Sequence, residues 1–387
     1  MMKLLSFALF LLLPLNVPAS PSEEERLALL FDDIWNQTMI SNPTYATYVG
    51  YPGQNALWPN PSVTAQAKSA GQRKEFLRQL RSIDAEKLNE DRYLEWMLVE
   101  KSLSAEVAGQ AYPEQFILLH QRTGVQQDIA DTLSMMPKFS RQDFIDRLAR
   151  LENAESYILS TIEVLREGLA KGITPPKVTL RDVPEQILNT IPSDIDKSPL
   201  LNSFSGFPDS MDQAEQEKIK ARARQIIKQQ VYPAFESLLH FLEDDYIPNS
   251  NTSIALIDMP NGADWYRHRA KSFTTTDLTP KQIHQLGLAE VKRIRKEMDK
   301  TISASGFEGT FDEFTHFLRT DPQFYMTSAN DLMVGYRDIA KRADPELAKL
   351  FGKLPRMPYG VIAIPDYAAK SQTSAYYWGG SSKNGRP

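Results

Sequence analysis

Histidines and carboxylates are the side chains that could support hydrolytic chemistry in this sequence. A hydrolytic zinc site typically needs three protein ligands and an open position for water. The chain has no cysteine and no H-E-x-x-H motif. None of its five histidines lies four positions from another; they are His120, His240, His268, His284 and His316. The spacing therefore predicts no catalytic residue and no metal ligand set, and only a site assembled from distant residues stays open.

Other catalytic classes find no support in the residue pattern. The chain has no G-x-S-x-G turn for a serine nucleophile, and no glycine-rich phosphate-binding loop. Its 49 acidic residues make chance carboxylate pairs unavoidable, so spacing cannot select a glycosidase pair. The net charge is −5 and no basic block is present, which excludes nucleic acid as the expected partner.

One polar and aromatic cluster could form the wall of a binding cleft. It contains Tyr266 and His268, beside Trp265 and the threonines 274–276, and it comes directly before a strongly marked helix start. There Thr279 can cap the N-terminus of the helix, Pro280 suits the first helical position, and Gln282 can complete a capping box with Thr279. The cluster predicts either substrate-binding residues, Tyr266 and His268, or a capped turn over the core, and both interpretations stay open.

Helices must position these residues, since apolar residues recur at helical spacing along most of the chain. We expect a mainly α fold, a large helical domain whose two long helices, 140–172 and 212–246, lie antiparallel, with a kink at Pro233. Further helices are expected at about 21–39, between 62 and 109 (two), at 183–189, 310–319 and 328–342. A small β element is expected toward the C-terminus, with strands at 254–257, 359–365 and 373–380.

The first residues have the order of an export signal. Lys3 precedes the apolar run 4–13, and Val17-Pro18-Ala19 offers small residues for cleavage after Ala19. The run is too short for a membrane anchor and is broken by Pro14. We therefore expect residues 1–19 to be a signal peptide and 20–387 to be a single periplasmic or secreted domain with no membrane span. The absence of cysteine also excludes a lipid-modified cysteine within these residues.

Three stretches resemble, in order, a family of secreted bacterial proteins known as domain of unknown function 885. They are SNPTYATYVGY (41–51), YRHRAKSFTTTDLTPKQIHQLGLAEVKRIRKEM (266–298) and IPDYAAKSQTSAYYWGGSSKNGRP (364–387). The resemblance implies a relation to gluzincin-like zinc metallopeptidases, and zinc as the cofactor of the full-length family. In that family a His-Glu-x-x-Pro-Gly-His-His type run follows the Arg-Pro of the third stretch. We accordingly expect this chain to correspond to the N-terminal portion of such a protein.

The resemblance also implies further binding residues. Tyr376 and Tyr377 match the paired tyrosines of the family, and Arg386 matches its arginine before the metal-binding helix. A phenol or guanidinium near a metal can stabilise an oxyanion. The expected function is that of an exported metallopeptidase-like protein, inactive alone and without its own cofactor, that meets a peptide or small-molecule substrate. The alternative is an exported non-catalytic binding protein that uses a helical groove.

Overall fold

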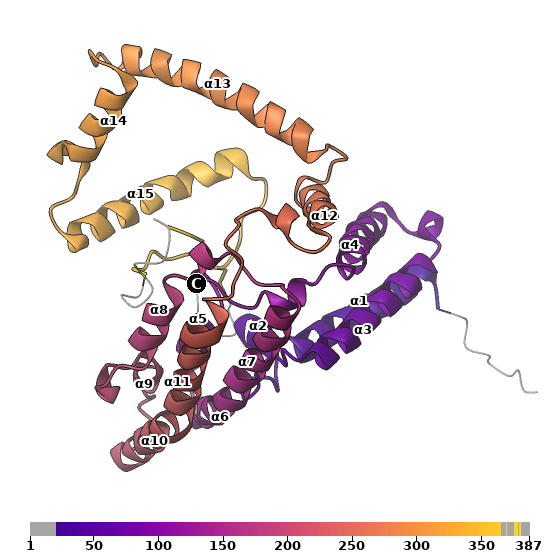
Figure 1. Cartoon of the computed structure of the whole chain (residues 1–387), viewed down its shortest axis with the longest axis vertical. Coiled ribbons are helices and arrows are strands. Elements are labelled where there is room, and N and C mark those ends of the chain that lie inside the picture. The colour runs from indigo at the N-terminus through magenta and orange to yellow at the C-terminus, as the bar shows by residue number, and fades with distance from the viewer. Residues whose placement is uncertain (1–20, 365–368, 370–374, 378, 381–387) are drawn as a thin grey trace, which may run out of the picture.

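The computed structural model describes residues 21–364, 369, 375–377 and 379–380. The expected mainly α fold is confirmed: the regular structure of this part is helical, with one isolated β-bridge between His120 and Thr123. Figure 1 shows a helical body and an arm made of α13, α14 and α15 that arches away from it. The expected signal peptide, residues 1–19, lies outside the described residues.

The N-terminal part of the body is a layer of three long helices. These are α1 (Glu23–Ser41), α3 (Val63–Arg81) and α4 (Glu90–Gly109). A capping box between Ser22 and Glu25 begins α1. Leu27 and Leu30 of α1 pack against Leu80 of α3 and Leu103 of α4 in a separate small core. All three helices were expected from the sequence.

A short helix joins this layer to the rest of the body. The sequence predicts a loop after residue 41, but α2 (Pro43–Val49) forms there instead. Pro43 occupies its first turn, where its missing N–H costs nothing, and the side chain of Asn42 accepts the N–H of Tyr45. Gly50, at φ +74°, ends the helix in the left-handed conformation that glycine tolerates.

The second part of the body is a bundle around the largest core. Its helices are α5 (Val125–Met135), α6 (Arg141–Glu152), α7 (Ala154–Ala170), α8 (Val183–Thr190), α9 (Pro199–Asn202), α10 (Gln213–Ile226) and α11 (Tyr232–His240). A capping box from Ser140 to Asp143 begins α6, at the start predicted for the helix 140–172. The single helix predicted for 140–172 is interrupted at Asn153, which separates α6 from α7.

The predicted helix at 212–246 is continuous but changes its winding near the proline. A π-helical stretch, Ile227–Val231, precedes α11, and a second, Phe241–Tyr246, follows it. Pro233 lies in the first turn of α11, directly after the π-helical stretch Ile227–Val231. There the altered winding accommodates the carbonyl that a proline leaves without a donor.

The predicted antiparallel packing of the two long segments is wrong, because they run parallel. Arg141, at the start of α6, pairs with Glu215 at the start of α10, and Glu152 pairs with Arg222 further along both helices. Arg166 of α7 then lies over the ring of Phe241. The reason is the connection between them, which is a return path through α8 and α9 rather than a short loop (Figure 1).

The arm begins after α12 (Gly262–Thr274), which packs on the body. It consists of α13 (Pro280–Ala304), α14 (Phe311–Thr320) and α15 (Ala329–Leu350). The capping box of Thr279 and Gln282 begins α13 as the sequence predicts. α12 was not predicted as a helix, and α15 extends eight residues beyond the predicted end at 342 despite Pro345.

The predicted β element is not found in the described residues. Residues 254–257 lead into a 3₁₀ turn, Leu256–Asp258, and 359–364 form no strand. A β-branched run becomes a strand only when another segment offers backbone groups for pairing. Here the carbonyl of Val361 accepts a hydrogen bond from the guanidinium of Arg337 on α15 instead. Part of the third predicted strand, 373–374 and 378, lies outside the described residues.

Candidate functional site

His268 and Tyr266 of α12 lie in different surroundings. The imidazole of His268 stacks on Tyr112 with ring centroids 5.1 Å apart, and Tyr112 also stacks on Trp265 at 6.2 Å. A Cβ added at Gly109 would lie 3.1 Å from Nε2 of His268. His268 thus takes part in the packing of α12 on the end of α4. Tyr266 is 52% exposed on the same helix.

A carboxylate fixes the other side of α12. Glu114 accepts hydrogen bonds from the indole Nε1 of buried Trp265 at 2.9 Å and from Arg269 at 3.0 Å. Both donors lie on one face of α12, one turn apart. These bonds anchor the helix that leads into the arm.

A group of aromatic residues lies on α1 and α2. An aromatic cluster is formed by Trp35, Tyr45 and Tyr48. The ring centroids of Trp35 and Tyr45 are 6.5 Å apart, and those of Tyr45 and Tyr48 are 6.2 Å apart. The Oη of Tyr48 donates to the carbonyl of Gly379 at 2.8 Å. The structure therefore brings Gly379 to the aromatic cluster from the opposite end of the sequence.

The predicted tyrosine pair lies close to that contact in the sequence. Tyr376 and Tyr377, three and two positions before Gly379, are 49% and 85% exposed. Gly379 allows the approach, since a Cβ there would lie 2.5 Å from Oη of Tyr48. Arg386, the remaining candidate, lies outside the described residues. Tyr48 belongs to the first stretch that resembles the family, where aromatic residues could line a groove or cover a helix face, and it was not among the residues predicted to bind substrate.

A buried arginine holds this region on the bundle. Nη2 of Arg150 donates to the carbonyls of Pro43, at 3.2 Å, and Gln54, at 2.7 Å. Its guanidinium lies over the indole ring of Trp58, 5.3 Å from the centroid, and Trp58 donates to the carbonyl of Arg150. Burial lowers the pKa of Arg150 to about 10, so it stays charged at neutral pH. The position of α2 is thus fixed by a buried cation.

A partly buried carboxylate, that of Asp128, lies near this support. Burial, together with the charge of Asp131 nearby, raises the pKa of Asp128 on α5 to about 6. Burial also raises the pKa of Tyr157, whose ring stacks on Trp58 at 5.2 Å, and Asp128 contributes to that shift. Perturbed groups of this kind occur in functional sites and in structural networks alike. Sequence spacing gave no signal for either residue.

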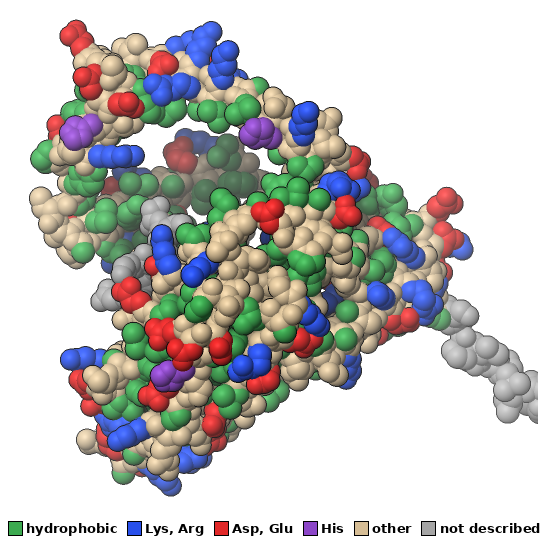
Figure 2. Space-filling model, in the orientation of Figure 1, with side chains coloured by type: hydrophobic (Ala, Val, Ile, Leu, Met, Phe, Trp, Pro, Cys, Tyr) green, Lys and Arg blue, Asp and Glu red, His purple; other side chains and the backbone are tan. Residues whose placement is uncertain are grey.

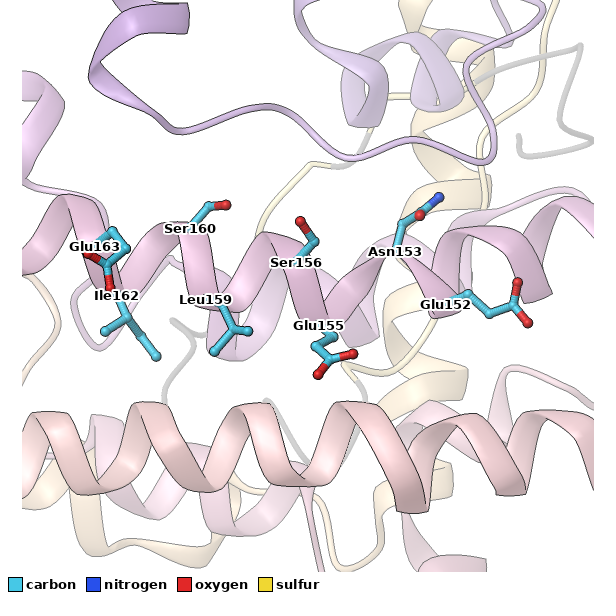
Figure 3. Close-up of a pocket in the computed structure, with 8 residues that line it drawn as sticks. All are labelled: Glu152, Asn153, Glu155, Ser156, Leu159, Ser160, Ile162 and Glu163. Atoms are coloured by element: carbon cyan, nitrogen blue, oxygen red, sulfur yellow. The ribbon is translucent and has the colours of Figure 1, made fainter.

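Two shallow grooves follow the surface of α7. Their volumes are about 500 and 580 Å³, and both include Ser160 and Glu163. Figure 3 shows Asn153, Ser156 and Ser160 on one side of the helix, and Glu155, Leu159 and Ile162 on the other. Because these side chains point away from one another, the first groove does not bring reactive groups together. It offers hydroxyl and carboxylate oxygens along a helix surface.

The largest hollow on the visible face lies between the arm and the body. Figure 2 shows this opening, with hydrophobic side chains along its margin. Large apolar residues of the arm are exposed, among them Val291 at 67% and Ile339 at 59%. We call this space, bounded by α13, α14, α15 and the body, the arm opening.

The described residues do not offer a ligand set for zinc. No three histidine, aspartate or glutamate side chains among them come together as a metal ion would require. The five histidines are distributed over the bridge at 120, the end of α11, and helices α12, α13 and α14. Within the same residues, none of the helices combines the length and the apolarity that crossing a membrane requires.

Comparisons with known proteins give a family model and two similar folds. Residues 43–387 match the model for "Bacterial protein of unknown function (DUF885)". A predicted lipoprotein from Colwellia psychrerythraea has a TM-score of 0.87 and 18% identity, over 95% of this chain and 66% of that one. A predicted lipoprotein of unknown function from Shewanella oneidensis has a TM-score of 0.55 and 16% identity, over 90% of this chain and 61% of that one. The chain thus spans just under two thirds of each, and no curated protein sequence matches it.

Proposed function

Because the chain belongs to the DUF885 family of bacterial proteins, we propose that it is an exported protein that binds an extended peptide as the substrate-binding part of a metallopeptidase-like hydrolase. Lys3, the apolar run and the predicted cleavage site after Ala19 support export to the periplasm or out of the cell. The description of both structural relatives as lipoproteins supports the same route.

The observation that carries the proposal is the contact between Tyr48 and Gly379. It joins two of the stretches that resemble the family, which lie 331 positions apart. Tyr45, which stacks beside Tyr48, and Tyr376 and Tyr377, which precede Gly379 by three and two positions, have exposed rings with phenolic hydroxyl groups. Tyrosine combines a large apolar surface with a hydrogen-bonding end, and it loses little side-chain entropy on binding. Such a surface suits the side chains and carbonyl groups of an extended peptide.

The role of these residues in the proposal is binding and orientation. Zinc would supply a Lewis acid and an activated water in the chemistry that the family resemblance implies. The described histidines and carboxylates do not fit that role, because they form no ligand cluster. We therefore propose that the chain alone binds peptide, holds no stoichiometric zinc and cleaves no peptide bond.

Titration of the purified full chain with a library of fluorescent peptides tests the proposal. We expect saturable anisotropy changes that weaken at least tenfold in a Tyr376→Ala, Tyr377→Ala double variant. Tyr93→Ala is the control, since the exposure of Tyr93, at 47%, is close to the 49% of Tyr376, but Tyr93 lies on α4. Equal loss in both variants, or no binding, would contradict the peptide-binding role.

Two further measurements on the same preparation test the absence of activity. Elemental analysis should find far less than one zinc per chain, and mass spectrometry should find every library peptide intact. One tightly held zinc per chain, or cleavage that a chelator abolishes, would show that the residues of this chain do carry the hydrolytic site.

A further inference from the structure

A small groove in the bundle is lined by cationic and neutral side chains without any carboxylate. Its volume is about 220 Å³, and α5, α6 and α9 contribute to its walls. Figure 1 shows α6 and α9 at the end of the body that lies away from the arm. We call this groove the α9 groove. Its polar side chains are those of Ser134, Lys138, Arg147, Asn202, Ser203 and Ser205.

The charge of the α9 groove differs from that of the chain as a whole. The chain has 49 acidic and 44 basic residues. The two grooves along α7 follow this balance, because each contains glutamates, among them Glu163. The α9 groove instead combines the ammonium of Lys138 with the guanidinium of Arg147. Its charge therefore favours an anionic ligand.

Arg147 is the buried cation of the groove. It is 1% exposed, and burial lowers its pKa to about 10, so it stays charged at neutral pH. Its Nη1 donates to the carbonyl of Ser203, and its Nη2 donates to those of Met136, at 2.7 Å, and Pro137, at 3.2 Å. Its Nε has no hydrogen-bond partner within the described part of the chain. A buried charge is usually compensated by an opposite charge, whereas these carbonyls supply only dipoles.

The carboxylate that acts on Arg147 is engaged elsewhere. The charge of Asp143, on the same helix, opposes the effect of burial on the pKa of Arg147. Its Oδ2, however, accepts the N–H groups of Phe139, at 2.9 Å, and Ser140, at 2.8 Å. These bonds hold Asp143 in the capping box that begins α6. Asp143 therefore compensates the charge of Arg147 only from a distance.

Lys138 is the exposed cation of the groove. Its side chain lies along Gly206, since a Cβ added to that glycine would be 3.2 Å from Nζ and 3.9 Å from Cδ of the lysine. Gly206 has a φ of +68°, in the left-handed region that glycine favours. The turn after α9 therefore has the conformation that leaves room for the lysine.

Two side chains of the groove have unused N–H donors. Among the described residues, neither Nζ of Lys138 nor the side-chain amide of Asn202 has a hydrogen-bond or ion-pair partner. The serine hydroxyl groups differ, because they already donate to backbone carbonyls; they are those of Ser134, Ser203 and Ser205. An ammonium and an amide are thus available to a ligand beside a buried positive charge.

We propose that the α9 groove binds a phosphate group, which Lys138 and Asn202 contact through hydrogen bonds and Arg147 stabilises through its charge. A phosphate group is a strong acceptor with up to two negative charges, and it forms charge-assisted hydrogen bonds with such donors. The groove is smaller than the roughly 300 Å³ at which sites for drug-sized ligands begin, which restricts the bound part of the ligand to a small group. The group can belong to a soluble phosphate or to a phospholipid. The proposal concerns neither the arm nor peptide binding at the tyrosines.

Calorimetric titration of the full chain with sodium phosphate, against sodium chloride of equal ionic strength, tests the site. We expect one saturable phosphate site per chain, and slower amide hydrogen exchange at residues 202–206 when phosphate is bound. Lys138→Ala should weaken binding about tenfold, because a hydrogen bond to a charged group contributes about that much, whereas Lys138→Arg should retain binding. Lys101→Ala is the matched control, since Lys101 is also exposed but lies on α4. All variants should unfold at the urea concentration of the parent chain.

Vesicles of phosphatidylglycerol distinguish the two sources of the phosphate group. Cosedimentation that added phosphate prevents and that Lys138→Ala abolishes would support the proposal with a phospholipid as the ligand. Calorimetric binding of phosphate without cosedimentation would support it with a soluble phosphate as the ligand.

Three outcomes would overturn the proposal. Neither phosphate nor the vesicles could bind to the chain. Lys138→Ala and Lys101→Ala could weaken binding equally, which would show that phosphate responds only to the overall charge. Bound phosphate could slow hydrogen exchange elsewhere while leaving residues 202–206 unchanged, which would assign the ion to another surface.

Discussion

The hydroxyl group of Tyr48 donates a hydrogen bond to the carbonyl of Gly379 at 2.8 Å, across 331 positions of sequence. The bond attaches the segment that carries Tyr376 and Tyr377 to α2. The absence of a side chain at Gly379 is a condition for it, since an added Cβ would lie 2.5 Å from the same oxygen.

Loss of this bond should release the C-terminal segment. Tyr48→Phe removes the donor and Gly379→Ala introduces the close contact, so each should weaken attachment by about 1 kcal/mol. We expect faster proteolytic cleavage after Tyr376 and Tyr377 in both variants. Tyr51→Phe is the control, because its hydroxyl group bonds to Asn36 and not to the C-terminal segment. Equal cleavage in all four proteins would show that the bond does not hold the segment.

Replacement of the buried arginine should destabilise the fold. Arg150→Lys retains a charge but cannot reach both the Pro43 and Gln54 carbonyls while lying over Trp58. We expect a loss of about 2 to 3 kcal/mol in the free energy of unfolding, measured with urea. Arg222→Lys, at an exposed ion pair with Glu152, should cost less than about 1 kcal/mol. Similar costs for the two variants would show that the buried bonds contribute little.

Stability should fall with rising pH through the titration of Asp128. Its pKa is raised from the ordinary value of 3.8 to about 6, so between these values the unfolded chain ionises while the folded chain keeps the proton. The contribution of protonated Asp128 to the free energy of unfolding is fully present below the lower pKa and lost above the higher one. Its total is on the order of 3 kcal/mol.

Asp128→Asn should therefore be more stable than the parent at pH 8, with the difference shrinking as pH falls from 6 to 4. Urea unfolding at several pH values measures this difference. The exposed Asp209 supplies the control variant, Asp209→Asn, which should show no such trend. A constant difference between Asp128→Asn and the parent would mean that Asp128 titrates normally.

Export should depend on the apolar run before Pro14. Sequencing of the exported protein should read Ser20 as the first residue. Leu11→Arg should keep the protein in the cytoplasm, whereas Leu29→Arg, at a position 62% exposed in α1, should be exported normally. An intact Met1 or Met2 on the exported protein would contradict cleavage after Ala19.

Local signals allowed most helices to be predicted. The boxes at Ser140 and Thr279 depend on residues three positions apart, and both helices begin where these boxes lie. The break at Asn153 gave no such signal, because Asn153 follows an uninterrupted apolar stripe. Pro43 was interpreted as a loop residue, although proline also suits the first turn of a helix.

Relations between distant segments could not be predicted in the same way. The direction of α10 relative to α6 depends on how residues 171–212 return, and composition does not fix that path. The strand predicted at 359–365 needed a partner that spacing cannot supply. For the site, Tyr376 and Tyr377 were identified by resemblance, but their attachment through Tyr48 and the support from Arg150 are contacts between distant segments. Nothing in the local sequence marks either contact.

The parallel course of α6–α7 and α10–α11 has a consequence for the kinetics of folding. Arg141 and Glu215 are 74 positions apart, and Glu152 and Arg222 are 70 apart, so the two faces meet only after the chain between them has returned. Helix pairs joined by short loops form from local contacts and fold fast, whereas distant contacts lengthen the search. The chain loses the conformational entropy of closing this loop before packing between α7 and α11 contributes any stabilising free energy. The body should therefore fold more slowly than an up-and-down bundle of equal size, with the formation of α8 and α9 as the step that permits closure.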